Sequence, residues 1–253
     1  MQRYFLEKEL AENQLQEIVI TGEQHHHMNR VMRMKEATQV YLVFPSGRSI
    51  IAEIITINQE QVSLKWIADE VAEKELPIQV TIASGLPKQD KLEFVVQKIT
   101  ELGAAAFIPF QGHFSITKWD HKKATKKIER LQKIALEAAE QSHRRKVPTI
   151  YPLATSIEEI AQQAADYDYC LVAYEESAKE NEQAVFAKVL QQVKPGEKIL
   201  VVFGPEGGLA PKEIEQLETA GFLLCGLGPR ILRTETAPLY VLSAISYVTE
   251  LKQ

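Results

Sequence analysis

From residue 77 onward, the chain alternates short apolar runs with segments whose apolar residues recur every three or four positions. The first pattern is typical of buried strands, and the second is typical of helices that cover a sheet. Strands are expected at 78–84, 104–110, 169–173, 198–203 and 223–227, and helices at 90–102, 122–145, 213–220 and 236–251. This alternation predicts an α/β fold with a mostly parallel sheet covered by helices on both faces.

The first 74 residues show a different pattern. Short alternating runs joined by brief turns, typical of hairpins and of a small β-barrel, lie at 40–44, 49–57 and 61–66. Residues 23–35 interrupt them and look helical. Composition and period both change in the acidic stretch 69–75. We therefore expect two domains, which comprise residues 1–74 and 75–253.

Hydrophobic residues make up 45% and charged residues 25% of the 253 residues, which is the balance of a globular protein. No apolar run approaches the roughly 20 residues that a membrane span needs, and the charged N-terminus does not resemble a signal peptide. Cys170 and Cys225 lie in apolar runs without CxxC spacing, so they are expected as core residues and not as zinc ligands. These features predict a cytoplasmic protein without membrane association.

Positive charge is concentrated in one segment of an acidic chain. The formal net charge is -5, yet residues 118–146 hold ten lysines and arginines against four acids. A concentrated basic segment steers a polyanion to one face, although a solvated helix surface has the same composition.

Two loops that follow expected strands have residues suited to a ligand. Residues 203–209 place three glycines and a proline after an apolar strand, which favours close approach of the backbone to a ligand over an ordinary turn. The spacing is not GxGxxG, which argues against an NAD-dependent oxidoreductase. Residues 227–237 contain Arg230 and Arg233, which helix capping does not explain. Arginines beside a glycine-lined loop are candidates for anion or RNA contact.

Two further sets of polar residues are candidates for RNA contact. The first recurs at i, i+4 and i+7 near the end of the expected helix 122–145, so it would share one face; it comprises Glu137, Gln141 and Arg144. The second lies in the N-terminal domain and comprises His27, Arg30, Arg33 and Lys35. Consecutive histidines at 25–27 cannot all face one ion from a helix, so nucleic-acid contact is favoured over metal binding.

These motifs together resemble those of one family, the ribosomal small-subunit methyltransferase E family (RsmE) of the SPOUT superfamily. The matching segments are 97–103 (QKITELG), 137–144 (EAAEQSHR), 203–209 (FGPEGGL) and 227–237. The N-terminal pattern His27-x-x-x-Val31-x-Arg33-x-Lys35 also fits. The family usually continues this pattern with Gly-Asp, whereas this chain has Ala37 and Thr38.

The resemblance implies a PUA-like RNA-binding barrel in residues 1–74 and a SPOUT methyltransferase domain, with a deep trefoil knot near the C-terminus, in residues 75–253. It implies that S-adenosylmethionine binds in the turns after residues 173, 203 and 226. The residues that would hold this cofactor are Ala173, Phe203, Gly204, Gly208, Leu227, Gly228, Ile231, Leu232 and Thr234.

The family's reaction transfers a methyl group to N3 of a uridine in the 16S rRNA of the small ribosomal subunit. Arg233, with Arg230 second, would stabilise negative charge on the uracil oxygens. Glu235, or a relay through Glu137, would accept the N3 proton, and no metal is needed. Two alternatives stay open. One is the same fold with another target, a ribose 2′-hydroxyl or a tRNA. The other is a non-catalytic RNA-binding assembly factor.

The family acts as a homodimer, and the expected last helix fits that state. Apolar residues surround almost the whole circumference of helix 236–251, so it needs cover on two sides. Its own sheet supplies one side, and a second copy in a two-fold dimer is expected to supply the other. Ile245 is the residue expected in that interface.

Overall fold

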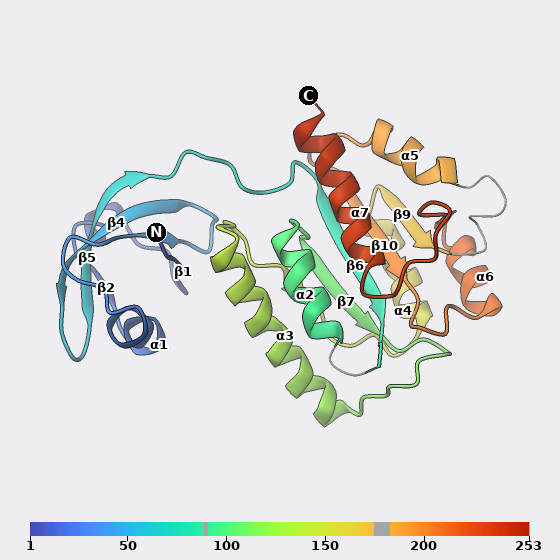
Figure 1. The fold of residues 1–253 in the computed structure, drawn as a ribbon, viewed down its shortest axis with the longest axis horizontal. Coiled ribbons are helices and arrows are strands. Elements are labelled where there is room, and N and C mark those ends of the chain that lie inside the picture. Colours follow the sequence, from blue (N-terminus) through green and yellow to red (C-terminus); the bar gives the residue numbers. More distant parts are fainter. Residues whose placement is uncertain (89–90, 175–182, 253) are drawn as a thin grey trace. The chain divides into compact units, whose positions relative to one another are not determined.

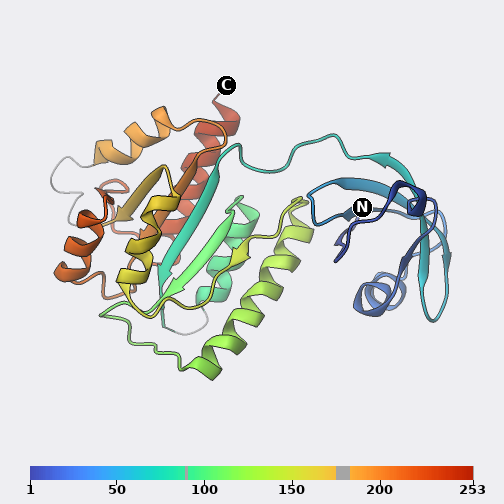
Figure 2. The ribbon, with the colours of Figure 1, turned by 180° about the vertical axis from the view of Figure 1, so that it is seen from behind.

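The computed structural model describes residues 1–88, 91–174 and 183–252, which form two compact units (Figures 1 and 2). The first unit consists of Met1–Lys74 together with Glu140–Lys146. The second consists of Glu75–Ala139 and the chain from Val147 onward. The assignment of residues 140–146 to the first unit is a tertiary feature that the sequence pattern did not indicate.

The first unit is built on a curled five-stranded sheet in the order β1-β3-β4-β5-β2 (Figure 1). Its strands are β1 Arg3–Phe5, β2 Ile18–Ile20, β3 Gln39–Val43, β4 Ser49–Ile57 and β5 Val62–Asp69. The pairs are antiparallel except β1 with β3. Alternate side chains such as Val40 and Leu42 are fully buried, as the period of a strand requires. The hairpins predicted from the sequence are confirmed.

The helix expected over residues 23–35 is shorter in the structure. α1 spans Gly22–His26, and one π-helical turn follows over His27–Val31. The chain then turns, because Arg33 and Ala37 have φ angles of 50° and 64°. Ala37 stands where the resemblance predicts a glycine. A left-handed φ strains alanine, because its Cβ clashes in this region, and glycine has no Cβ.

The second unit contains a six-stranded parallel sheet in the order β11-β9-β10-β6-β7-β8. Its strands are β6 Gln79–Gly85, β7 Ala106–Phe110, β8 Thr149–Ile150, β9 Tyr169–Ala173, β10 Lys198–Phe203 and β11 Leu223–Cys225. Its helices are α2 Lys91–Glu101, α3 His121–Gln141, α4 Ile157–Ala161, α5 Gln183–Gln192, α6 Pro211–Thr219 and α7 Ala237–Ser246. The predicted α/β class is confirmed. The sequence pattern had missed β8, α4 and α5, and residue 90 of the expected helix 90–102 lies outside the described residues.

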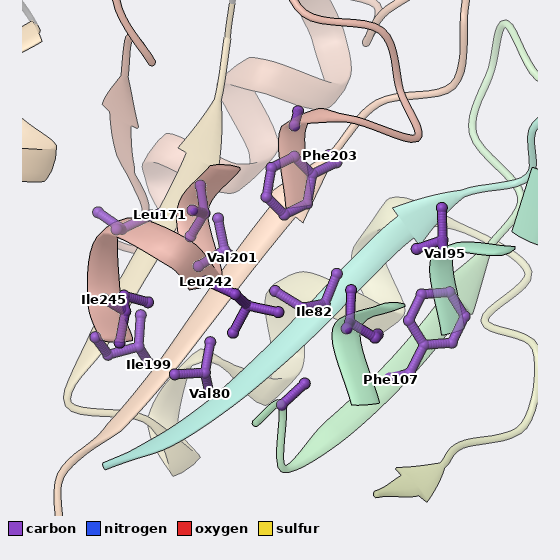
Figure 3. Packing of buried hydrophobic residues seen from close by; sticks show 14 of the residues in the cluster. Val80, Ile82, Val95, Phe107, Leu171, Ile199, Val201, Phe203, Leu242 and Ile245 are labelled. Carbon is purple, nitrogen blue, oxygen red and sulfur yellow. The ribbon is translucent and has the colours of Figure 1, made fainter. Parts of the chain in front are cut away.

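Helices cover both faces of this sheet, and β10 shows how the sequence specifies that arrangement. Ile199 and Val201 pack in one core layer with α2, α3, α5 and α7, whereas Leu200 and Val202 pack in the other with α4 and α6. In Figure 3, Leu242 and Ile245 of α7 lie against residues of β6 and β10. A strand buried on both faces reads as a continuous apolar run. Cys170 and Cys225 are buried core residues, as expected.

Two expectations about the helices were wrong. α3 ends at Gln141 and not at residue 145, because His143 has a φ of 58° and leaves the helical conformation. Ile245 is fully buried in the core of its own unit and therefore cannot face a second subunit. The exposed residues at the end of the chain include Tyr240 and Tyr247, the latter in a π-helical turn at Tyr247–Leu251 that follows α7. Within the described ranges, no helix has the length and hydropathy to cross a membrane.

Candidate functional site

Three parallel strands of the second unit end at one edge of the sheet. β11, β9 and β10 are neighbours and parallel, so the segments that follow them leave the same edge. In open α/β sheets, ligands bind outside the carboxyl ends of the strands. The backbone N–H of Tyr174, the residue after β9, donates to the carbonyl oxygen of Cys225 at the end of β11, at 3.1 Å. Most of the loop after Ala173, residues 175–182, lies outside the described residues.

The loop after β10 folds tightly back on itself. A Cβ atom on Gly204 would lie 3.0 Å from the carbonyl carbon of Gly208, which is tighter than most side-chain contacts and would force the loop to shift. Gly208 has a φ of 75°, a conformation that favours glycine, and it is exposed. Phe203, immediately before the loop, is buried and anchors it to the sheet. The loop therefore leaves a stretch of accessible backbone at the edge of the sheet, whose N–H and C=O groups could bind a cofactor.

The loop after β11 carries the two arginines that the sequence singled out. Gly228 has a φ of 102° and turns the chain. The backbone N–H groups of Thr236 and Ala237 both donate to the carbonyl oxygen of Arg233, at 2.8 and 3.0 Å, and form the start of α7. Arg230 and Arg233 are exposed, and within the described residues neither guanidinium group makes an ion pair. Both are therefore available to an anionic group at this edge.

The other residues expected to hold the cofactor in this loop differ in exposure. Leu227, Leu232 and Thr234 are half-buried, whereas the side chain of Ile231 is 75% exposed. A role for Ile231 would therefore rest on its backbone and not on a buried side chain.

Lys91, at the start of α2, bridges the second and third loops. Its Nζ atom lies 3.2 Å from Glu206 Oε1 and 3.2 Å from Glu235 Oε2. The backbone N–H of Lys88 also donates to both carboxylate oxygens of Glu206, at 3.0 and 3.2 Å. Lys91 could not be singled out from the sequence, because a lysine in the first turn of an amphipathic helix has no distinguishing spacing. Only the fold shows that the ammonium group of Lys91 is shared by two carboxylates that are far from it in the sequence.

The charges around Glu235 decide its ionisation. Burial disfavours the carboxylate, but its backbone hydrogen bond and the charges of Lys91 and Arg233 outweigh burial and lower its pKa. Hydrogen bonds to Glu235 and Glu206 in turn raise the pKa of Lys91. The pair is therefore fully ionised at neutral pH, and Glu235 is a weak proton acceptor there.

The residues expected to contact RNA are divided between the two units. In the first unit Arg30, Arg33 and Lys35 are exposed, and the half-buried His27 has its Nδ1 atom 2.9 Å from the hydroxyl oxygen of Tyr4. Glu137 and Gln141 are exposed on α3, but Arg144 lies beyond the end of that helix and is 3% exposed. The expectation that Glu137, Gln141 and Arg144 share one helix face is therefore wrong.

The basic helix α3 is only partly neutralised. Glu93 of α2 pairs with Arg130 at 2.6 Å and with Lys127 at 3.5 Å, and the hydrogen bond from Arg130 holds the pKa of Glu93 below its usual range. Other lysines of this helix remain exposed; they are Lys122, Lys123, Lys126 and Lys133. This surface keeps the positive charge that a polyanionic partner requires.

Two family models match the chain. Residues 74–246 match the model described as an RNA methyltransferase domain, and residues 20–65 match the RNA methyltransferase PUA domain.

Similar proteins span the whole chain. The ribosomal RNA small subunit methyltransferase E of Bacillus subtilis is 51% identical over 254 residues, covering 99% of this chain and 98% of the relative. The enzyme of the same name from Synechocystis is 30% identical, covering 92% of this chain and 74% of the relative. The crystal structure of a ribosomal RNA small subunit methyltransferase E from Neisseria gonorrhoeae bound to S-adenosyl methionine superimposes with a TM-score of 0.83, at 26% identity over 98% of both chains.

Proposed function

The chain belongs to the ribosomal RNA small subunit methyltransferase E family, and we propose that it methylates N3 of a uridine in 16S rRNA. It is an S-adenosylmethionine-dependent methyltransferase of small-subunit rRNA with an α/β SPOUT fold and an N-terminal PUA domain. The observation that supports the proposed chemistry is the convergence of two glycine loops with exposed Arg230 and Arg233 at one edge of the sheet.

We propose that residues 1–74 bind RNA, that residues 75–253 carry the methyltransferase activity, and that the loops after β9, β10 and β11 belong to a trefoil knot. The protein would work as a homodimer on rRNA in the cytoplasm. Tyr240 and Tyr247, which are 42% and 57% exposed, support an interface at the end of the chain. Exposed aromatic residues of this kind are enriched at protein interfaces.

The residues of the two described loops fit the cofactor. Gly204 lets the loop fold back on itself, Gly208 leaves exposed backbone at the edge of the sheet, and Gly228 has a positive φ in the neighbouring loop. Together with Ala173, these loops would hold the cofactor largely through backbone groups, helped by Leu227, Leu232 and Thr234. When bound, S-adenosylmethionine supplies an electrophilic methyl group on a positively charged sulfur.

Arg233 and Arg230 would stabilise the substrate. As N3 of uracil loses its proton, negative charge spreads over the two carbonyl oxygens of the ring. An exposed guanidinium group is suited to donate to such an oxygen, and donors in place before the reaction lower its barrier. The nitrogen would then form the new bond to the methyl carbon as the carbon–sulfur bond breaks. The sulfur would keep that electron pair and become a neutral thioether, and the N3 proton would pass to solvent.

Glu235 is better suited to positioning than to accepting the proton. Its carboxylate is paired with Lys91, and its lowered pKa makes it a poor base at neutral pH. It lies two residues from Arg233 and holds the loop that carries this arginine. Glu137, the second candidate for a proton relay, is exposed on α3.

Methylation of rRNA from a strain lacking this protein tests the proposal. The purified protein and labelled S-adenosylmethionine are incubated with small ribosomal subunits from that strain, and the nucleosides are identified by mass spectrometry. We expect N3-methyluridine in 16S rRNA. A 2′-O-methylated nucleoside or a methylated tRNA would establish a different target, and cofactor binding without any methylation would favour an assembly factor.

The role of the glycine loop is tested by Gly208→Val. Valine is strained at a φ of 75°, so we expect the variant to lose cofactor binding in calorimetry while its thermal unfolding shows an intact fold. Unchanged affinity for S-adenosylmethionine would remove this loop from the cofactor site.

A further inference from the structure

The loop that joins β7 to α3 can be followed in Figure 1. Two of its apolar side chains are exposed to solvent. Phe114 is 44% exposed and Ile116 is 72% exposed, and His113 beside them is also exposed. The rings of His113 and Phe114 meet edge to face, with centroids 4.9 Å apart. Contact with water is unfavourable for the apolar surface of an aromatic ring. Exposed rings that gather on one short segment therefore indicate a binding site.

This loop is held in place by hydrogen bonds from several directions. The backbone N–H of Gly112 donates to Ser115 Oγ at 3.1 Å, and Thr117 Oγ1 donates to the carbonyl oxygen of Pro87 at 2.9 Å. The backbone N–H of His113 donates to Glu213 Oε1 at 2.8 Å. Glu213, at the start of α6, is only 8% exposed, and its other oxygen accepts the N–H of Ala210 at 2.7 Å. The rings are therefore presented by a fixed backbone.

The same loop lies directly beside the glycine loop of the cofactor site. A Cβ atom on Gly207 would lie 2.9 Å from Phe114 Cβ, a separation that real side chains do not reach. Gly207 therefore allows Phe114 to lie against the loop that follows β10. The exposed ring is thus adjacent to the proposed site of methyl transfer.

We propose that Phe114, assisted by His113, forms a stacking platform for an unpaired nucleobase of the rRNA beside the methyl-transfer site. Base stacking on aromatic side chains is a common way to hold a base outside a duplex. A rigid platform lowers the entropic cost of binding. This inference rests on the proposed function, because it requires RNA as the substrate.

The positive charges beside the platform favour an RNA base, and not an apolar protein segment, as the group that stacks on it. The chain continues from the platform to exposed Lys118 and then to Lys122 and Lys126 on α3. Asp120 is the one acid in this stretch, and its side chain caps the helix by accepting the N–H of Lys123 at 2.8 Å. Aromatic rings followed by cations are the combination that single-stranded nucleic acid recognises, because the cations follow the phosphates.

Phe114→Ala in the full-length protein tests the platform. We expect its affinity for unmodified 16S rRNA to fall about fivefold to a hundredfold, the equivalent of one lost stacking contact. Affinity for S-adenosylmethionine should not change, because the glycine loop keeps its backbone. Tyr151→Ala is the matched control, since Tyr151 is 39% exposed in the same unit, and its RNA affinity should stay at the wild-type value.

Phe114→Trp distinguishes stacking on a base from a purely structural role of Phe114. Tryptophan preserves a stacking face, so RNA affinity should be retained. Adding an oligouridylate should quench the emission of this variant more than that of the wild type, whose emission comes from Trp66 and Trp119. Phe114→Leu keeps an apolar side chain without a π-face and should bind RNA as weakly as Phe114→Ala.

Three results would overturn the platform: full RNA affinity in Phe114→Ala, wild-type affinity in Phe114→Leu, or no quenching in Phe114→Trp beyond that of the wild type. Failure of the proposed function is distinguishable, because the wild-type protein itself would then not methylate rRNA.

Discussion

Lys91 Nζ lies 3.2 Å from Glu235 Oε2, so the first turn of α2 is joined to the loop that carries Arg233. The same ammonium group lies 3.2 Å from Glu206 in the glycine loop. Lys91 therefore sets the spacing between the two loops that would enclose the cofactor. Its contribution is one of positioning, since partly exposed ion pairs add little to global stability.

Replacing Lys91 by methionine should weaken cofactor binding without unfolding the protein. We expect the Kd for S-adenosylmethionine to rise about threefold to tenfold, because two carboxylates lose their shared cation and the loops separate. Lys91→Arg should restore most of the affinity. Lys98→Met is the control, because Lys98 forms an ion pair of similar exposure within the same helix, with Glu101. Calorimetry that finds the same loss in both methionine variants would remove the positioning role of Lys91.

Ala37→Gly should stabilise the protein. Ala37 has a φ of 64°, which costs an L-residue about 1–2 kcal/mol, while glycine adds about 0.4–1 kcal/mol of unfolded-state entropy. The net gain expected in urea denaturation is about 0.5 kcal/mol. Ala68→Gly, in strand β5, should instead destabilise the protein by about 0.5–1 kcal/mol. A loss of stability in Ala37→Gly would contradict the strained φ.

The buried ion pair of Arg3 and Glu70 should make the first unit sensitive to acid. Arg3 Nη2 lies 2.8 Å from both carboxylate oxygens of Glu70, and the two side chains are 0% and 7% exposed. Burial disfavours ionisation of Glu70, but hydrogen bonds led by Arg3 outweigh it and lower its pKa. The unfolded chain therefore binds a proton more readily, and stability falls as pH drops below about 4.5, the ordinary glutamate value.

Glu70→Gln should lower the free energy of unfolding at pH 7 by about 3–5 kcal/mol, because it leaves a buried guanidinium group without its counter-charge. The loss of stability between pH 5 and pH 3, followed by urea denaturation, should then be smaller than in the wild type. Glu17→Gln, at an exposed position of the same unit, is the control. Equal acid sensitivity in the wild type and Glu70→Gln would exclude Glu70 as its source.

The proposed dimer is best tested at Tyr247. Tyr247→Glu places a charge on an exposed ring, so it should dissociate the dimer in sedimentation experiments and leave thermal unfolding of the monomer unchanged. Ile245→Glu should instead unfold the second unit, since Ile245 is fully buried in its core. A wild-type protein that is monomeric and fully active at the assay concentration would refute the dimer.

Several features could be predicted from the sequence because their causes are local or periodic. The apolar run of β10 arises because the strand is buried on both faces, and the amphipathic pattern of α2 arises because the helix is buried on one face. Both elements lie where the sequence predicts them. The glycine loop after β10 was recognisable because Gly204 directly follows the strand and Gly208 follows four residues later. The short elements β8 and α4 were missed, because two to five residues do not complete a period.

By itself, the sequence determined the α/β class, the family and the loops that carry Arg230 and Arg233, because these depend on residue types at fixed spacings. The tertiary structure alone decided that Lys91 lies between Glu206 and Glu235, that Phe114 lies against Gly207 and that Ile245 faces the core. Each of these contacts joins positions far apart in the chain or depends on which helix face meets the sheet. Strand order and packing determine such contacts, and no local spacing records them.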